Sequence, residues 1–106
     1  MTQLEKEIEK KLRQTVENHG GRCLKWTCPG WSGVPDRIVL MPGGRIHFVE
    51  TKRPKGGKYS AMQDKWRDWL HALGFCYWRI ENLGHLTGFE LILLGELDLL
   101  GRQGRK

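Results

Sequence analysis

Three residues whose side chains suit metal-dependent hydrolysis stand close together in the middle of the chain: Asp36, Glu50 and Lys52. Asp36 begins one short apolar run, and the other two residues end the next run, after an intervening Pro-Gly-Gly. Side chains alternate along a strand, so Glu50 and Lys52 share a face. Carboxylates on adjacent strands suit Mg²⁺, which prefers hard oxygen ligands, and a neighbouring lysine can assist a metal-activated water. The spacing therefore predicts a metal-dependent nuclease centre.

Each of these acidic residues also has a purely structural interpretation. Asp36 follows a proline and could be a turn aspartate that accepts hydrogen bonds from nearby amides. Glu50 falls on the apolar face of its strand, where a half-buried carboxylate needs a partner. That partner could be Lys52 or Arg37 in a plain ion pair. The occurrence of all three residues in this order, separated by one hairpin, favours the metal site.

Two further polar residues lie on predicted helices. At about 100° per residue, Glu5 falls inside the apolar stripe of the first helix, whereas Glu9 sits at its edge. We expect Glu5 to point towards the metal pocket; the alternative is a first-turn carboxylate that favours the helix dipole. Gln63 stands three residues after Ser60, the spacing of a capping box, and on the inward side of its helix. Capping and a role in the site both remain open for Gln63.

The surrounding pattern predicts an α/β fold. Apolar residues recur every four positions in the first segment, which ends at Gly20-Gly21, and again in a segment that ends at Gly74. Short apolar runs between and after them indicate strands, two of which form a hairpin. The expected elements are a helix over 2–19, strands over 22–28, 36–41 and 45–52, a helix over 60–74 and a strand over 75–80. After Glu81, glycines interrupt apolar pieces that could be short strands or short helical turns.

Composition bounds the class of protein. The chain has 106 residues, enough for one domain over 1–106. No apolar run approaches the roughly 20 residues of a membrane span, and the charged N-terminus lacks the apolar core of a signal peptide. We therefore expect no membrane contact and a cytoplasmic location, in a bacterial or phage-infected cell.

The positive charge of the chain predicts a nucleic acid as partner. The net charge of +6 and the pI near 9.5 would attract a polyanion, and a basic loop follows Lys52 directly. Trp66 and Trp69 stand at helical spacing and are expected in the core, whereas Trp31 lies in a loop and could stack on bases. The residues expected to contact nucleic acid are Arg37, Arg53, Lys55, Lys58 and Trp31.

These motifs resemble a known family. Gly33-Val34-Pro35-Asp36-Arg37, then Phe48-Val49-Glu50-Thr51-Lys52, then Ser60 and Gln63 ahead of an apolar helix, are similar to the virus-type replication-repair nuclease (VRR-NUC) domain of the PD-(D/E)xK nuclease superfamily. The resemblance covers residues 2–81. It implies a restriction-endonuclease-like αβββαβ core with a mixed central sheet flanked by helices, a Mg²⁺ or Mn²⁺ cofactor, and cleavage of DNA phosphodiesters.

The resemblance also assigns roles to residues. Asp36, Glu50 and the backbone carbonyl of Thr51 would bind the metal, and Lys52 would assist the nucleophilic water. Glu5 and Gln63 match the helix glutamate and the glutamine of the outer motif of the family.

The chain is similar to standalone members of this family that act as homodimers on branched DNA. A homodimeric four-way (Holliday) junction resolvase is therefore the first hypothesis, since two symmetric nicks require two sites and a two-fold pair supplies them. The apolar stretch 89–94 could be the interface. A nicking or flap nuclease of replication, repair or restriction is the second hypothesis. A non-catalytic, basic nucleic-acid-binding module is the third.

Overall fold

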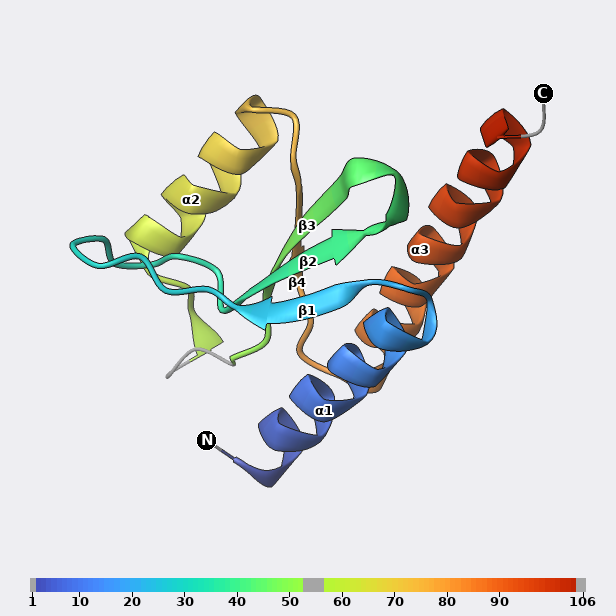
Figure 1. Cartoon of the computed structure of the whole chain (residues 1–106). Helices are drawn as coiled ribbons and strands as arrows, with labels where there is room; N and C mark the ends of the chain where they lie inside the picture. The colour runs from blue at the N-terminus through green and yellow to red at the C-terminus, as the bar shows by residue number, and fades with distance from the viewer. Residues whose placement is uncertain (1, 53–56, 105–106) are drawn as a thin grey trace.

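The chain folds into a mixed four-stranded sheet with helices on both faces (Figure 1). The computed structural model describes residues 2–52 and 57–104. The α/β class expected from the sequence is confirmed. In chain order the elements are α1 (Gln3–Asn18), β1 (Arg22–Lys25), β2 (Arg37–Met41), the 3₁₀ turn η1 (Pro42–Gly44), β3 (Arg45–Glu50), α2 (Ala61–Ala72), β4 (Cys76–Arg79) and α3 (Leu83–Gly104).

The topology of the sheet brings the two acidic motifs together. The strands lie in the order β1-β2-β3-β4, the first three antiparallel and β4 parallel to β3. Because β2 and β3 are antiparallel, the start of β2 lies beside the end of β3. Their register pairs Arg37 with Val49, so Asp36 stands opposite Glu50 on the same face of the sheet.

Helices α1 and α3 cover one face of the sheet, and α2 covers the other (Figure 1). The four-residue repeat of α1 buries Ile8, Leu12 and Val16 completely. The chain then turns at Gly20-Gly21, where α1 passes very close to the end of β2. A Cβ atom on Gly21 would lie 2.7 Å from the carbonyl oxygen of Leu40, so this close approach requires glycine.

Helix α2 packs its apolar side on an aromatic cluster. Its start has the predicted capping box: the Ser60 hydroxyl accepts from the Gln63 N–H, and the Gln63 side chain accepts from the Ser60 N–H. Trp66 is half-buried among aromatic neighbours. The expectation that Trp69 lies in the core is wrong, because it sits at the rim of the cluster with 42% of its surface exposed. The cluster consists of Trp26, Trp31, Phe48, Trp66, Trp69 and Phe75.

The region after Glu81 is one continuous 22-residue helix and not the short strands or helical turns expected from its glycines. The inward side of α3 buries Leu86, Phe89 and Leu93 in the main core. A glycine inside a helix costs about 1 kcal/mol relative to alanine, whereas burial of each large apolar side chain stabilises by about 1.5–3 kcal/mol. Packing therefore outweighs the helix-breaking tendency of the glycines.

A polar network fastens α3 to β3. His47 is fully buried, and its Nδ1 accepts a hydrogen bond from the indole N–H of Trp78 at 3.1 Å. Because an indole can only donate, Nε2 of His47 carries the proton and donates to Glu96 at 2.7 Å. The guanidinium of Arg45 binds the other oxygen of Glu96. The strand that carries Glu50 is thus held to α3 through these paired polar groups.

None of the helices among the described residues combines the length and the hydrophobicity that crossing a bilayer requires.

Candidate active site

Asp36 is held in place by backbone groups at the end of β3. Its Oδ2 accepts hydrogen bonds from the N–H groups of Thr51 and Lys52, both at 3.0 Å, and lies 3.2 Å from the Thr51 hydroxyl. Burial would raise the pKa of Asp36, but hydrogen bonds from Glu50, Thr51 and Lys52 outweigh it and lower the pKa. Asp36 is therefore an ionised, fixed carboxylate.

Glu50 has the opposite electrostatic character. Its side chain is almost fully buried. Burial, followed by the hydrogen bond to Asp36 and the negative charge of Asp36, raises the pKa of Glu50 to about 9. In the absence of a cation, the two carboxyl groups therefore share one proton at neutral pH.

Two neighbours of Glu50 favour its ionised form. The Gln63 side chain hydrogen bonds to Glu50, and the positive charge of Lys52 acts on both Glu50 and Asp36. The amide oxygen of Gln63 accepts from Ser60, so its amide nitrogen is the group left to act on Glu50. The capping role of Gln63 is confirmed, and the same side chain lies near enough to Glu50 to lower its pKa.

The carboxylate of α1 that reaches this cluster is Glu9 and not Glu5. Glu9 Oε1 lies 3.3 Å from the Thr51 hydroxyl, and Glu9 Oε2 lies 3.5 Å from the Arg37 guanidinium. Among the described residues, the Glu5 carboxylate forms no side-chain hydrogen bond or ion pair, and the backbone N–H of Glu5 donates to the Thr2 cap. The first turns of α1 extend past the sheet (Figure 1), so a residue that shares the apolar stripe there has no sheet beneath it. The feature of the sequence that could have favoured Glu9 is that it lies one helical turn after Glu5 on α1.

The donor set fits a divalent metal ion. Two carboxyl groups that share a proton, one of them buried, concentrate negative charge, and a cation would remove the need for that proton. Hard oxygen ligands suit Mg²⁺ and Mn²⁺. Within residues 2–52 and 57–104 there is no cluster of three or more His, Cys, Asp or Glu side chains with metal-binding geometry, so Asp36 and Glu50 would need backbone carbonyl or water ligands to complete a site.

The residues predicted to contact nucleic acid differ in their exposure to solvent. Trp31 is exposed, as expected, and Lys58 is also exposed. Arg37 lies beside the site but is largely buried and paired with Glu9. Arg53 and Lys55 fall outside the described residues.

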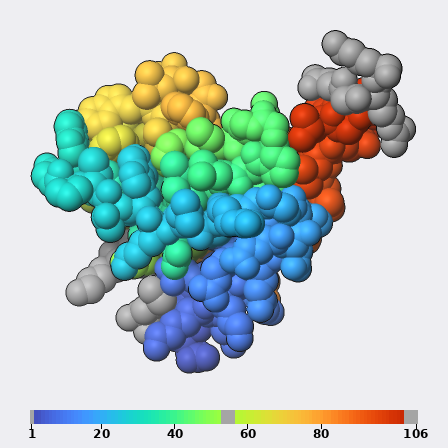
Figure 2. All heavy atoms as spheres, in the orientation of Figure 1, coloured from blue at the N-terminus to red at the C-terminus, as the bar shows by residue number. Residues whose placement is uncertain are grey.

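An open cavity of about 210 Å³ adjoins Asp36 and includes two lysines and an aromatic wall. Lys25 and Trp26, which are not among the predicted site residues, line it because the end of β1 runs beside the start of β2. The complete lining is Glu9, Lys25, Trp26, Thr27, Val34, Pro35, Asp36, Arg37 and Lys52. In the space-filling view the loop that follows β1 stands out from the body at this side of the molecule (Figure 2).

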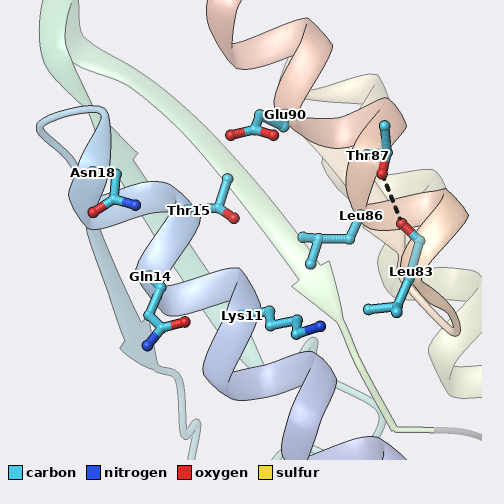
Figure 3. A pocket seen from close by; sticks show the side chains of 8 residues that line it. All are labelled: Lys11, Gln14, Thr15, Asn18, Leu83, Leu86, Thr87 and Glu90. Atoms are coloured by element: carbon cyan, nitrogen blue, oxygen red, sulfur yellow. Dashed lines mark hydrogen bonds between the residues drawn. The ribbon is translucent and has the colours of Figure 1, made fainter.

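A second cavity, of about 340 Å³, lies between α1 and α3 (Figure 3). Its titratable side chains are one cation and one anion, Lys11 and Glu90, which come from different helices. This groove does not contain the paired carboxylates that distinguish the Asp36–Glu50 site.

Comparison with known proteins identifies the family of the chain. The chain is 46% identical over 70 residues to the protein named "Putative nuclease p44" of Acyrthosiphon pisum secondary endosymbiont phage 1, a match that covers 66% of this chain and 74% of the relative. A solved structure described as "VRR_NUC domain" superposes with a TM-score of 0.74 at 25% identity and covers 82% of this chain and 94% of the other. No family model matches the chain. The fold and the phage relative together show that the chain belongs to the VRR-NUC family of nucleases.

Proposed function

We propose that this nuclease is a homodimeric, divalent-metal-dependent endonuclease that cleaves branched DNA, with the four-way junction as its preferred substrate. The observation that carries the metal-dependent chemistry is the pairing of the buried Glu50 with the half-buried Asp36, with Lys52 beside them. A buried carboxylate whose pKa stands near 9 is unfavourable for folding. Its presence is explained if a cation normally neutralises the pair.

Each side chain has a definite task in this proposal. A bound Mg²⁺ or Mn²⁺ would activate water and stabilise negative charge on the phosphate. Asp36 and Glu50 would hold the ion, together with the backbone carbonyl of Thr51. The ammonium group of Lys52 supplies positive charge where the attacked phosphate gains negative charge. Gln63 orients Glu50 through its amide N–H.

The DNA is proposed to run past the loop that follows β1. Trp31 offers an exposed aromatic face for base stacking, which contributes about 1–3 kcal/mol per base. Lys58, with Arg53 and Lys55 of the basic loop, would contact phosphates. Arg37 would act from its ion pair with Glu9 beside the site.

The homodimer is proposed because of what the resolution of a four-way junction requires. A four-way junction is resolved by two nicks related by symmetry, and the described residues contain one Asp36–Glu50 pair. A two-fold pair of chains would present two such sites.

Cleavage of defined DNA substrates tests the proposal. Labelled four-way junctions, flaps, nicked duplexes and the linear duplex arms are incubated with Mg²⁺, Mn²⁺ or chelator. We expect paired symmetric cuts in the junction, loss of these cuts with chelator, and at least a tenfold slower reaction on the linear arms. Preferred cutting of flaps or single nicks would support the second hypothesis. Binding without cutting under every metal condition would support the non-catalytic module.

A comparison of two glutamates tests the positioning role of α1. We expect Glu9→Ala to lower the cleavage rate about 10–100-fold, the usual effect of removing a group that orients a metal ligand, and to raise the Mn²⁺ concentration needed for half-maximal rate. Glu5→Ala, on the same helix and one turn away, is the matched control and should stay within about twofold of the wild type. The reverse order would return the helix glutamate role to Glu5.

A further inference from the structure

The outward side of α3 is an exposed face of apolar and small residues. Leu91, with 63% of its surface exposed, and Leu99, with 57%, are among the most exposed large apolar residues described. Ile92 lies beside Leu91 and is also exposed. Soluble monomers rarely leave such a contiguous apolar face uncovered. The face consists of Gly84, Gly88, Leu91, Ile92, Gly95 and Leu99, and it is called the α3 face below.

The glycines of this face are not needed to fit the fold of the single chain. A Cβ atom on Gly88 or Gly95 would meet no atom within 4 Å. Each glycine nevertheless makes the helix less stable by about 1 kcal/mol than alanine would. Glycine at such positions lets another helix backbone approach closely, so the pattern indicates a helix partner.

We propose that a second copy of this chain covers the α3 face, with the two α3 helices antiparallel about a two-fold axis that passes between Leu91 and Ile92. A two-fold interface must be complementary to itself, and this face is. With the axis at that point, Gly88 of one copy is level with Gly95 of the other. Leu99 of each copy is level with Gly84 of the other, so a large side chain meets the space left by a glycine.

The charges near the ends of the face agree with this register. Arg102 is exposed on α3, and its guanidinium already binds Asp98 at 3.1 Å. In the antiparallel pair, Arg102 comes level with the segment just before the partner's α3, which carries a glutamate at position 81 that accepts a hydrogen bond from Tyr59 of its own chain, so opposite charges approach each other at both ends. A parallel pair would instead place Arg102 level with the same arginine of the partner subunit.

The α3 face is also rigidly presented. The inward side of the helix is fixed by buried apolar residues and by the Arg45–Glu96–His47 contacts to β3. A preformed helix loses little conformational entropy when it pairs. The interface is therefore attached directly to the strand that carries Glu50, which holds the two proposed active sites in a defined relation.

This inference rests on the homodimer in the proposed function and names its contact surface. The test is the oligomeric state of the full chain by sedimentation equilibrium over a range of concentrations. We expect a wild-type dimer, and we expect Leu91→Asp to weaken dimerisation at least about thirtyfold, as for a central interface residue. Leu73→Asp is the matched control, since Leu73 is a 72% exposed leucine at the end of α2; it should leave the dimer unchanged.

A second variant separates the interface from folding. Gly95→Leu adds a side chain where the single chain has open space, so the fold is expected to be retained or stabilised, as measured by thermal unfolding. The same side chain would block the approach of Gly88 of the partner subunit and favour the monomer. Gly101→Leu also enters open space but lies off the α3 face, and it should leave the dimer intact.

The outcomes distinguish this inference from the proposed function. A monomeric wild type, or a dimer that persists in both Leu91→Asp and Gly95→Leu, would overturn the α3 interface. Junction cutting by such a persistent dimer would leave the proposed function standing. A dimer that is lost in both variants, in a protein that never cuts DNA, would support the interface and reject the proposed function.

Discussion

Replacement of Glu50 by Gln is expected to abolish DNA cleavage and, in chelator, to make the protein more stable. Glutamine has the shape of a protonated glutamate but cannot provide a negatively charged metal ligand, so the cleavage rate should fall about a thousandfold or more. Without metal, the wild type must keep Glu50 protonated or tolerate a buried negative charge beside the ionised Asp36. Glutamine removes that cost, so we expect a gain on the order of 2 kcal/mol in the free energy of unfolding at pH 7.

The stability gained by Glu50→Gln over the wild type should increase as the pH rises. The pKa of Glu50 is raised from 4.5 to about 9 in the folded chain. A raised pKa means that the folded state binds more protons than the unfolded state between these values, so stability is lost as pH rises from about 4.5 to about 9. In Glu50→Gln this contribution is absent, and its stability advantage over the wild type should widen across that range.

Denaturant unfolding in chelator at several pH values, beside a cleavage assay in Mn²⁺, measures both effects. Glu7→Gln is a suitable control because Glu7 is an exposed carboxylate on α1; both its activity and its stability should match the wild type. Addition of Mn²⁺ should stabilise the wild type and leave Glu50→Gln little changed. Full activity in Glu50→Gln, or an equal Mn²⁺ response, would remove Glu50 from the metal site.

Removal of the Asp36 carboxylate should abolish cleavage as completely but destabilise the fold. Asp36→Ala takes an acceptor from the Thr51 N–H, the Thr51 hydroxyl and the Lys52 N–H. Thr51 is fully buried, so its backbone donor would lose its partner without access to water. A buried unsatisfied group of this kind costs about 1–3 kcal/mol. The two carboxylates of one site are thus expected to affect stability with opposite signs.

Asp36→Asn separates the two roles of Asp36. An asparagine oxygen can still accept from the backbone donors, so we expect most of the stability to return, while the weaker, neutral ligand keeps activity at least about a hundredfold below the wild type. Circular dichroism and thermal unfolding would report the fold of each variant. Recovery of cleavage in Asp36→Asn would show that Asp36 acts only as a structural acceptor.

Much of the arrangement around Asp36 could be predicted from the sequence because local rules determine it. A single hairpin set Asp36 opposite Glu50, as the spacing of the two motifs predicted. β3 ends at Glu50, so the alternation that was expected to continue to Lys52 stops two residues before it. The Ser60 capping box was likewise predicted from a three-residue spacing and is present. The mixed sheet with flanking helices is confirmed as well.

The remaining features depend on contacts that local patterns do not contain. Whether Glu5 or Glu9 meets Thr51 depends on how far α1 slides along the sheet, which helical periodicity leaves undetermined. The continuity of α3 depends on Phe89 and Leu93 finding the core, and that tertiary contact overrides the helix-breaking tendency of its glycines. Trp69 is exposed because it lies at the rim of the aromatic cluster, a position that helical spacing alone does not specify.

The two hydrogen bonds of Gln63 restrict which amino acids can replace it. Its oxygen accepts from the Ser60 N–H, and its side chain also lowers the pKa of Glu50. A glutamate of the same length could accept from Ser60 but would place a third negative charge against the carboxylate pair. A lysine could donate to Glu50 but could not accept from the helix start, and an asparagine is one methylene shorter. Glutamine meets both requirements, so a substitution at this position is expected to change the start of α2 and the charge balance of the Asp36–Glu50 pair together.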